Sequence, residues 1–241
     1  MEVAIEPDAQ SVAECATRLL AADIESCVST HGVAHWVAAG GTTPGLAYGA
    51  LARRTDLPWD RVKILMGDER CVPIGDESSN WTRLAAELLD VVGVRDDLRL
   101  RPPAELGAES AASEYESTIE LLSPEARSPR FDHAWIGVGE DGHTLSLFPS
   151  HPSLAPTDRL VVPVHNAPKP PPDRISFTFD ALEGVGHLVI LACGASKQDA
   201  VAGALGESSA LPVARAARTV ESAGGRVTWL LDQAAAASLA A

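Results

Sequence analysis

The chain has 241 residues, of which 46% are hydrophobic and 22% charged, a balance typical of a globular protein rather than of a disordered one. Its formal net charge is −14, and it has no dense run of Lys or Arg that would bind nucleic acid or an anionic membrane. We therefore expect neither a nucleic acid nor a membrane as a partner. At this length we expect residues 1–241 to form a single domain.

The cysteines and the first residues indicate a cytoplasmic protein. Four cysteines are present and none forms a CxxC pair: Cys15, Cys27, Cys71 and Cys193. The opening MEVAIEPDAQ lacks the basic region and apolar run of a secretion signal. The longest apolar stretch, HLVILACGA, is too short to span a bilayer. We expect reduced thiols and no metal site.

The first half of the chain predicts alternating helices and strands. Apolar residues recur at helical spacing over residues 11–29, and HWVAA (35–39) reads as a strand that ends in GGTTPG. VKILMGDE (62–69) predicts a second buried strand. Two further helices are predicted over residues 80–92, with Asn80 as N-cap, and over residues 110–122.

The second half continues the alternation. It predicts strands over residues 131–139, 159–164, 174–179, 187–194 and 226–232, and helices over residues 196–205 and 232–240. The Pro-rich NAPKPPPDR (166–174) is predicted as a surface loop. Such alternation predicts an α/β fold, a doubly wound and mostly parallel sheet with helices on both faces, similar to a Rossmann fold.

Four loops with polar motifs each follow a predicted strand: AAGGTTP (38–44), LMGDERCVP (65–73), IGVGEDGH (136–143) and LACGASK (191–197). In open α/β sheets, ligands bind beyond the carboxyl ends of the strands. We therefore expect these four loops to converge on one crevice.

The loop 137–143 allows two interpretations. Gly137, Gly139 and Gly142 match the GxGxxG spacing of a dinucleotide-binding loop. That loop requires a long helix after its last glycine, which the prolines at positions 149 and 152 exclude. We favour the second interpretation, in which the loop presents His143 as a base with Asp141 orienting it, over a histidine that only caps a short helix.

Several residues suit the binding of a phosphate. Gly40, Gly41, Thr42 and Thr43 precede Pro44 and offer free N–H groups and hydroxyls at a helix start, although a plain helix cap explains them too. Three cations complete the predicted binding set, together with Asp68: Arg70, Arg174 and Lys197. Arg70 could bind an anion or pair with Asp68 or Glu69, and these alternatives stay open.

In order along the chain, AAGGTTP, GDERCVP, SSNWT, GVGEDGHTLSLFP, RISFTF and GASK resemble the motifs of 6-phosphogluconolactonases. The resemblance implies a fold like that of glucosamine-6-phosphate isomerases. It also implies hydrolysis of 6-phosphogluconolactone in the pentose phosphate pathway without cofactor or metal. The oligomeric state stays open between a monomer and a weak homo-oligomer. His143 is then the base, and Arg70 a further catalytic residue. Thr42 and Leu145 depart from the usual Ser and Ala of the family.

Two alternatives differ in residues that can be checked. A glucosamine-6-phosphate deaminase has the same type of loop but carries a carboxylate after it, where this chain has SLFPS (146–150). A sugar-phosphate-sensing domain of a transcription regulator would adjoin a DNA-binding helix-turn-helix, and this sequence contains no basic recognition helix.

Overall fold

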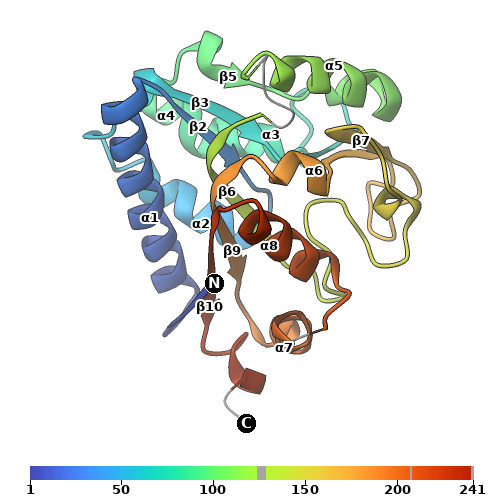
Figure 1. The fold of residues 1–241 in the computed structure, drawn as a ribbon. Coiled ribbons are helices and arrows are strands. Elements are labelled where there is room, and N and C mark those ends of the chain that lie inside the picture. The colour runs from blue at the N-terminus through green and yellow to red at the C-terminus, as the bar shows by residue number, and fades with distance from the viewer. Residues whose placement is uncertain (124–128, 207, 240–241) are drawn as a thin grey trace.

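A seven-stranded parallel sheet forms the centre of the protein. The structure is a computed structural model that describes residues 1–123, 129–206 and 208–239 (Figure 1). The strands lie in the order β1-β10-β9-β6-β2-β3-β5, and every neighbouring pair is parallel. They span β1 (Glu2–Glu6), β2 (Ala34–Ala38), β3 (Val62–Met66), β5 (Arg99–Leu100), β6 (Phe131–Gly137), β9 (Val185–Ala192) and β10 (Arg226–Asp232).

The helices cover both faces of this sheet, as the sequence predicts (Figure 1). They are α1 (Ala9–His31), α2 (Thr42–Leu51), α3 (Asn80–Leu84), α4 (Asp90–Val92), α5 (Ala108–Glu120), α6 (Phe179–Leu182), α7 (Gln198–Leu205) and α8 (Pro212–Ser222). A π-helical turn, Ala85–Leu89, joins α3 to α4.

Alternating side chains of the strands pack into two separate hydrophobic cores, one on each face of the sheet. Trp36 and Trp135 pack with α1, α2 and α3 on one face, whereas Val37 and Ile136 pack with α5 and α8 on the other. Because successive strand residues point to opposite faces, a strand buried on both sides is apolar throughout, and this explains why the strands β2, β6, β9 and β10 could be predicted.

A second, three-stranded antiparallel sheet corrects one prediction. The sequence predicts a strand over residues 62–69 that runs into a loop motif at residues 65–73, but β3 ends at Met66, and Asp68, Glu69 and Arg70 form a separate strand, β4 (Asp68–Arg70). This strand pairs with β8 (Arg174–Phe177), which pairs with β7 (Val161–Val164). The small sheet lies beyond the end of β3, since only Gly67 separates the two strands. It adds its side chains to the same edge of the main sheet.

One further prediction fails for a local reason. The predicted helix over residues 232–240 is wrong: the Asp232 carboxylate accepts hydrogen bonds from the N–H of Ala235 and of Gly194, and a turn leads into a 3₁₀ turn at Ala237–Leu239. Residue 240 lies outside the described residues. Strands β1 and β5 and helices α6 and α8 are absent from the predicted elements. Within the described ranges, no helix has the length and apolar character that crossing a membrane requires.

Candidate active site

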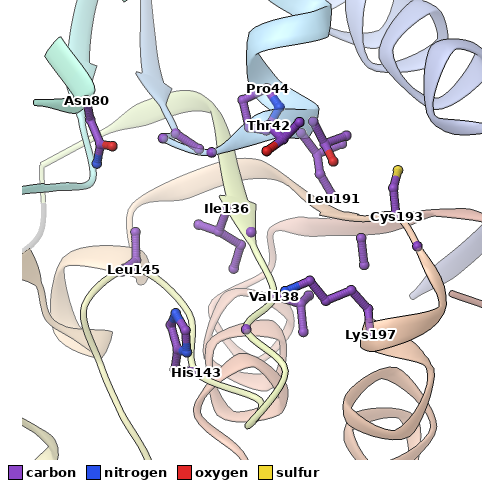
Figure 2. Close-up of a pocket in the computed structure, with 18 of the residues that line it drawn as sticks. Thr42, Pro44, Asn80, Ile136, Val138, His143, Leu145, Leu191, Cys193 and Lys197 are labelled. Carbon is purple, nitrogen blue, oxygen red and sulfur yellow. The ribbon is translucent and has the colours of Figure 1, made fainter. Parts of the chain in front are cut away.

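A pocket of about 720 Å³ opens at the carboxyl ends of β2, β6 and β9 (Figure 2). The chain order reverses between β2 and β6, which is where open α/β sheets bind ligands. All predicted site residues except Asp141 line it: Gly40, Gly41, Thr42, Thr43, Asp68, Arg70, His143, Arg174 and Lys197. Asp141 lies directly behind His143. The structure therefore brings the predicted loops together.

His143 and Asp141 form a hydrogen-bonded pair. His143 Nδ1 lies 2.5 Å from Asp141 Oδ1, and the His143 side chain is 16% exposed. Because Nδ1 contacts Asp141, Nε2 is the ring nitrogen of His143 that does not contact this carboxylate. The Phe148 ring, centred 4.5 Å from the imidazole, packs against it. The arrangement therefore fixes one tautomer and one orientation of the imidazole.

The surroundings keep this imidazole neutral. Burial lowers the pKa of His143, and Asp141 opposes this shift only in part. Burial also pushes the pKa of Asp141 upward, but its hydrogen bonds from His143 outweigh burial and the pKa of Asp141 is lowered. At neutral pH the pair is therefore an unprotonated imidazole beside a carboxylate, which is the form a general base requires.

Glycines make room for the histidine in loop 138–143. A Cβ atom at Gly139 would lie 1.9 Å from His143 Nδ1, so no larger residue fits there without moving the base. Gly139 also donates its N–H to the carbonyl of His143, at 2.8 Å, and Gly142 has φ +79°. No helix follows this loop, which continues through a turn at Thr144–Leu147. The loop therefore lacks the helix N-terminus of a dinucleotide site.

The loop before α2 leaves backbone donors free at the pocket. Gly41 occupies the N-cap position with φ 111°, and no side chain caps the helix. Thr42 and Thr43 open the helix, and Pro44 follows. Because the first N–H groups of a helix have no intrahelical partner, those of Thr42 and Thr43 are available to an anion.

Asn80 contacts this loop from the neighbouring helix. A Cβ atom at Gly40 would lie 2.0 Å from Asn80 Oδ1, so the two residues are in close contact. Asn80 donates through Nδ2 to the carbonyl of Asp68 at 3.2 Å. The N-cap of α3 is Ser79, not Asn80 as the sequence predicts. Asn80 therefore joins the loop before α2 to β4. The sequence predicts Asn80 only as a helix cap, although it lines the pocket.

Glu69 anchors that helix from below the pocket. Its carboxylate accepts hydrogen bonds from the backbone N–H of Arg70, Asn80 and Trp81 and from the Ser79 hydroxyl. Burial raises the pKa of Glu69, while these four donors act in the opposite direction. With all its acceptor positions directed at backbone and hydroxyl donors, Glu69 is a structural residue. It forms no ion pair with Arg70 in the described part of the chain.

Arg70 and Arg174 lie directly opposite each other on β4 and β8. Like charges in this position repel each other unless a negative charge compensates them. Among the described residues, no carboxylate forms an ion pair with either guanidinium. Arg70 Nη1 donates to the carbonyl of Ser78 at 2.5 Å, but its Nε is buried without a partner. This pair is therefore suited to bind an anion.

Arg174 also holds the Pro-rich loop in place. Its Nε donates to the carbonyl of Pro171 at 3.0 Å, and Nη2 donates to the carbonyls of Lys169 at 2.9 Å and Pro170 at 3.2 Å. Arg174 is only 4% exposed. Most of its donors are therefore used inside the protein, and its main contribution to the pocket is to position Lys169.

Lys169 is a pocket residue that sequence reasoning missed. It lines the pocket although the sequence predicts only a surface loop there. Neither its ammonium group nor that of Lys197 forms an ion pair within the part of the chain described. Burial and the charge of Lys169 lower the pKa of Lys197. Figure 2 shows Lys197 extending toward Val138, with His143 on the other side of Val138.

Asp68 joins β4 to the segment that follows His143, beneath the pocket. Its carboxylate accepts a hydrogen bond from the Ser146 hydroxyl at 2.6 Å, and the side chain is buried. Leu145, beside Ser146, has φ 53°, and its side chain lies where a Cβ atom of Gly67 would stand. Leu145 therefore fills space between the loop that carries His143 and the turn between β3 and β4.

Comparisons with known proteins show which family the sequence matches. The family model described as glucosamine-6-phosphate isomerases/6-phosphogluconolactonase matches residues 7–229. A 6-phosphogluconolactonase of Streptomyces coelicolor is 36% identical over 99% of this chain and 94% of its own length.

Solved structures share the fold. A 6-phosphogluconolactonase from Trypanosoma cruzi superposes with a TM-score of 0.88 at 24% identity, covering 100% of this chain and 97% of the other. A monomeric glucosamine-6-phosphate deaminase superposes with a TM-score of 0.82 at 20% identity, covering 99% and 100% of the two chains. At such identities the likeness establishes the fold alone, so activity must be argued from the site.

Proposed function

Because this chain belongs to the glucosamine-6-phosphate isomerase/6-phosphogluconolactonase family, we propose that it hydrolyses 6-phosphogluconolactone to 6-phosphogluconate. The observation that carries this proposal is one pocket that combines a neutral, oriented imidazole with four cations. The imidazole is that of His143, and the cations are Arg70, Lys169, Arg174 and Lys197. A neutral base suits attack by water, and the cations suit an anionic substrate.

In the proposed mechanism, Nε2 of His143 takes a proton from water as the water oxygen bonds to the lactone carbonyl carbon. The bond from this carbon to the ring oxygen then breaks, and the imidazolium returns the proton to that oxygen. Asp141 stabilises the imidazolium through its contact with Nδ1 of His143. The reaction consumes one water and requires no cofactor.

We assign phosphate binding to Arg70, Lys169 and Lys197, together with the N–H groups of Thr42 and Thr43. Arg70 has a buried Nε without a partner, and both lysines lack ion pairs in the described structure. Arg174 supports Lys169 and adds positive charge. The same charges would stabilise the negative oxygen that forms on the carbonyl.

The experiment compares turnover of 6-phosphogluconolactone with its spontaneous hydrolysis. We expect His143→Ala to lower kcat by about 10² to 10⁴, the usual contribution of a general base, with a smaller change in KM. A folded variant with near-normal kcat would contradict the mechanism. Glucosamine 6-phosphate is the control substrate, and its turnover would favour the deaminase, for which residues 146–150 offer no carboxylate.

A further inference from the structure

A second cluster of ionisable side chains lies at the other edge of the sheet, where the strands begin. His133 and His187 are the third residues of β6 and β9 and stand opposite each other in register. Asp23, on α1, packs over them, and the Nδ1 atoms of both histidines lie 2.6 Å from its Oδ2 atom. The three atoms lie within 4.8 Å of one another. The sequence expectation of no metal site did not consider this grouping, because the three residues are far apart in the chain.

Hydrogen bonds account for most contacts in this cluster but not for one. With a proton on each Nδ1, both imidazoles donate to Asp23 Oδ2, and Arg226 Nη2 donates to Asp23 Oδ1 at 2.9 Å. Nη2 of Arg226 then also lies 2.9 Å from His187 Nδ1, and two donors face each other there because a guanidinium only donates. A cation bound to the two Nδ1 atoms and the carboxylate would replace these hydrogen bonds, with Arg226 moved away.

The surroundings leave room for a metal ion and give one of the two imidazoles an outer partner, while Nε2 of His133 is buried without a partner among the described residues. Nε2 of His187 lies 3.0 Å from Thr228 Oγ1, and such an outer contact orients the imidazole of a metal ligand. His133 and His187 are 1% and 3% exposed. A cavity of about 350 Å³, lined by Asp23, His187 and Arg226, reaches the cluster from solvent. Arg226 is 66% exposed, so its side chain can move away from an incoming ion.

We propose that Asp23, His133 and His187 bind a divalent transition-metal ion of the Zn²⁺ class. Two imidazoles and a carboxylate are donors that such ions accept. Metal bonds of about 2.0–2.2 Å require the 2.6 Å contacts to open, and the adjoining cavity provides that space. The site lies away from the lactonase pocket, because it is at the amino ends of the parallel strands and the pocket is at their carboxyl ends. Its role is therefore structural rather than catalytic.

The test is binding of Zn²⁺ to the purified chain after removal of metals, measured by equilibrium dialysis with metal analysis. We expect one Zn²⁺ per chain. Asp23→Asn, which keeps the shape of the side chain, should weaken binding by more than the roughly 10- to 100-fold that loss of an outer partner costs. Thr228→Val should weaken it within that range. His165→Gln is the matched control, since His165 also contacts two carboxylates, those of Asp173 and Glu109, but is exposed.

Unchanged lactonase turnover of Asp23→Asn serves as the folding control, and Co²⁺ in place of Zn²⁺ gives a visible spectrum that reports nitrogen ligands. The proposal is overturned if the wild type takes up no stoichiometric Zn²⁺, or if Asp23→Asn binds it as the wild type does. Uptake that is lost in His143→Ala but kept in Asp23→Asn would place the ion in the active-site pocket and would also overturn it.

Discussion

At the scale of single residues, the lowered pKa of His143 sets the pH dependence of the reaction. The base is active when neutral, and burial lowers its pKa below the ordinary 6.5. At pH 7 His143 should therefore be neutral and active. Activity should fall in acid, because the imidazole becomes protonated as the pH drops through this lowered pKa. We expect kcat/KM to show an acid limb below pH 6.5, measured with buffers of constant ionic strength.

The variant Asp141→Asn tests whether the acid limb of kcat/KM arises from His143 or from another titrating group. The carboxylate raises the pKa of His143, so its removal should move the acid limb to still lower pH and reduce kcat through loss of orientation. An acid limb that stays in place in Asp141→Asn would assign it to a different group.

Lys169 and Lys197, the pocket lysines without an ion pair to a described residue, are the residues whose loss should be specific to the phosphate. A charge-assisted hydrogen bond contributes about 1.5–3 kcal/mol. Lys197→Ala and Lys169→Ala should therefore each lower kcat/KM for the phosphorylated lactone by roughly 10- to 150-fold. Unphosphorylated gluconolactone should be affected little. Equal losses on both lactones, at unchanged thermal stability, would mean that the lysine acts at the carbonyl.

At the scale of an element, loop 138–143 positions the base through a glycine that tolerates no side chain. Gly139→Ala would place a methyl group 1.9 Å from His143 Nδ1 and displace the ring. We expect kcat to fall by about 10², since a misplacement of about 1 Å has this effect. Gly137→Ala is the matched control, because a Cβ atom there meets no atom within 4 Å. Similar kcat values for the two variants would refute this role of the loop.

The same scale explains two mistaken predictions. The Ala-rich stretch 232–240 has high helix propensity, but short helices are marginal without tertiary support, and Asp232 instead closes a turn onto Gly194. A strand over residues 62–69 was expected to run into a loop motif. The chain instead forms two strands, β3 and β4, because β8 pairs with residues 68–70 and the Glu69 carboxylate caps the start of α3.

At the scale of the whole molecule, the active-site pocket lies at the carboxyl ends of the strands, and the cluster of Asp23, His133 and His187 lies at their amino ends. This distance separates the functions of the two sites. The proposed reaction uses His143 and water without a metal, so EDTA should leave kcat and KM unchanged, as measured by lactone hydrolysis. Zn²⁺ added to metal-free protein should instead raise the melting temperature, because an ion that binds only the folded state stabilises it. Turnover that is lost in EDTA and restored by a divalent ion would show that the catalytic step requires a metal.

The sequence by itself determined the alternation of helices and strands and the loops that converge on the pocket, because periodicity and glycine-rich strand ends are local signals. The pocket residues His143, Thr42 and Lys197 could be predicted in this way, since each lies shortly after a recognisable strand end. Only the tertiary structure decided that Arg70 lies opposite Arg174, that Lys169 reaches the pocket, and that Asp23 meets His133 and His187. These contacts join residues far apart in the chain, and strand order and register create them, neither of which local pattern specifies.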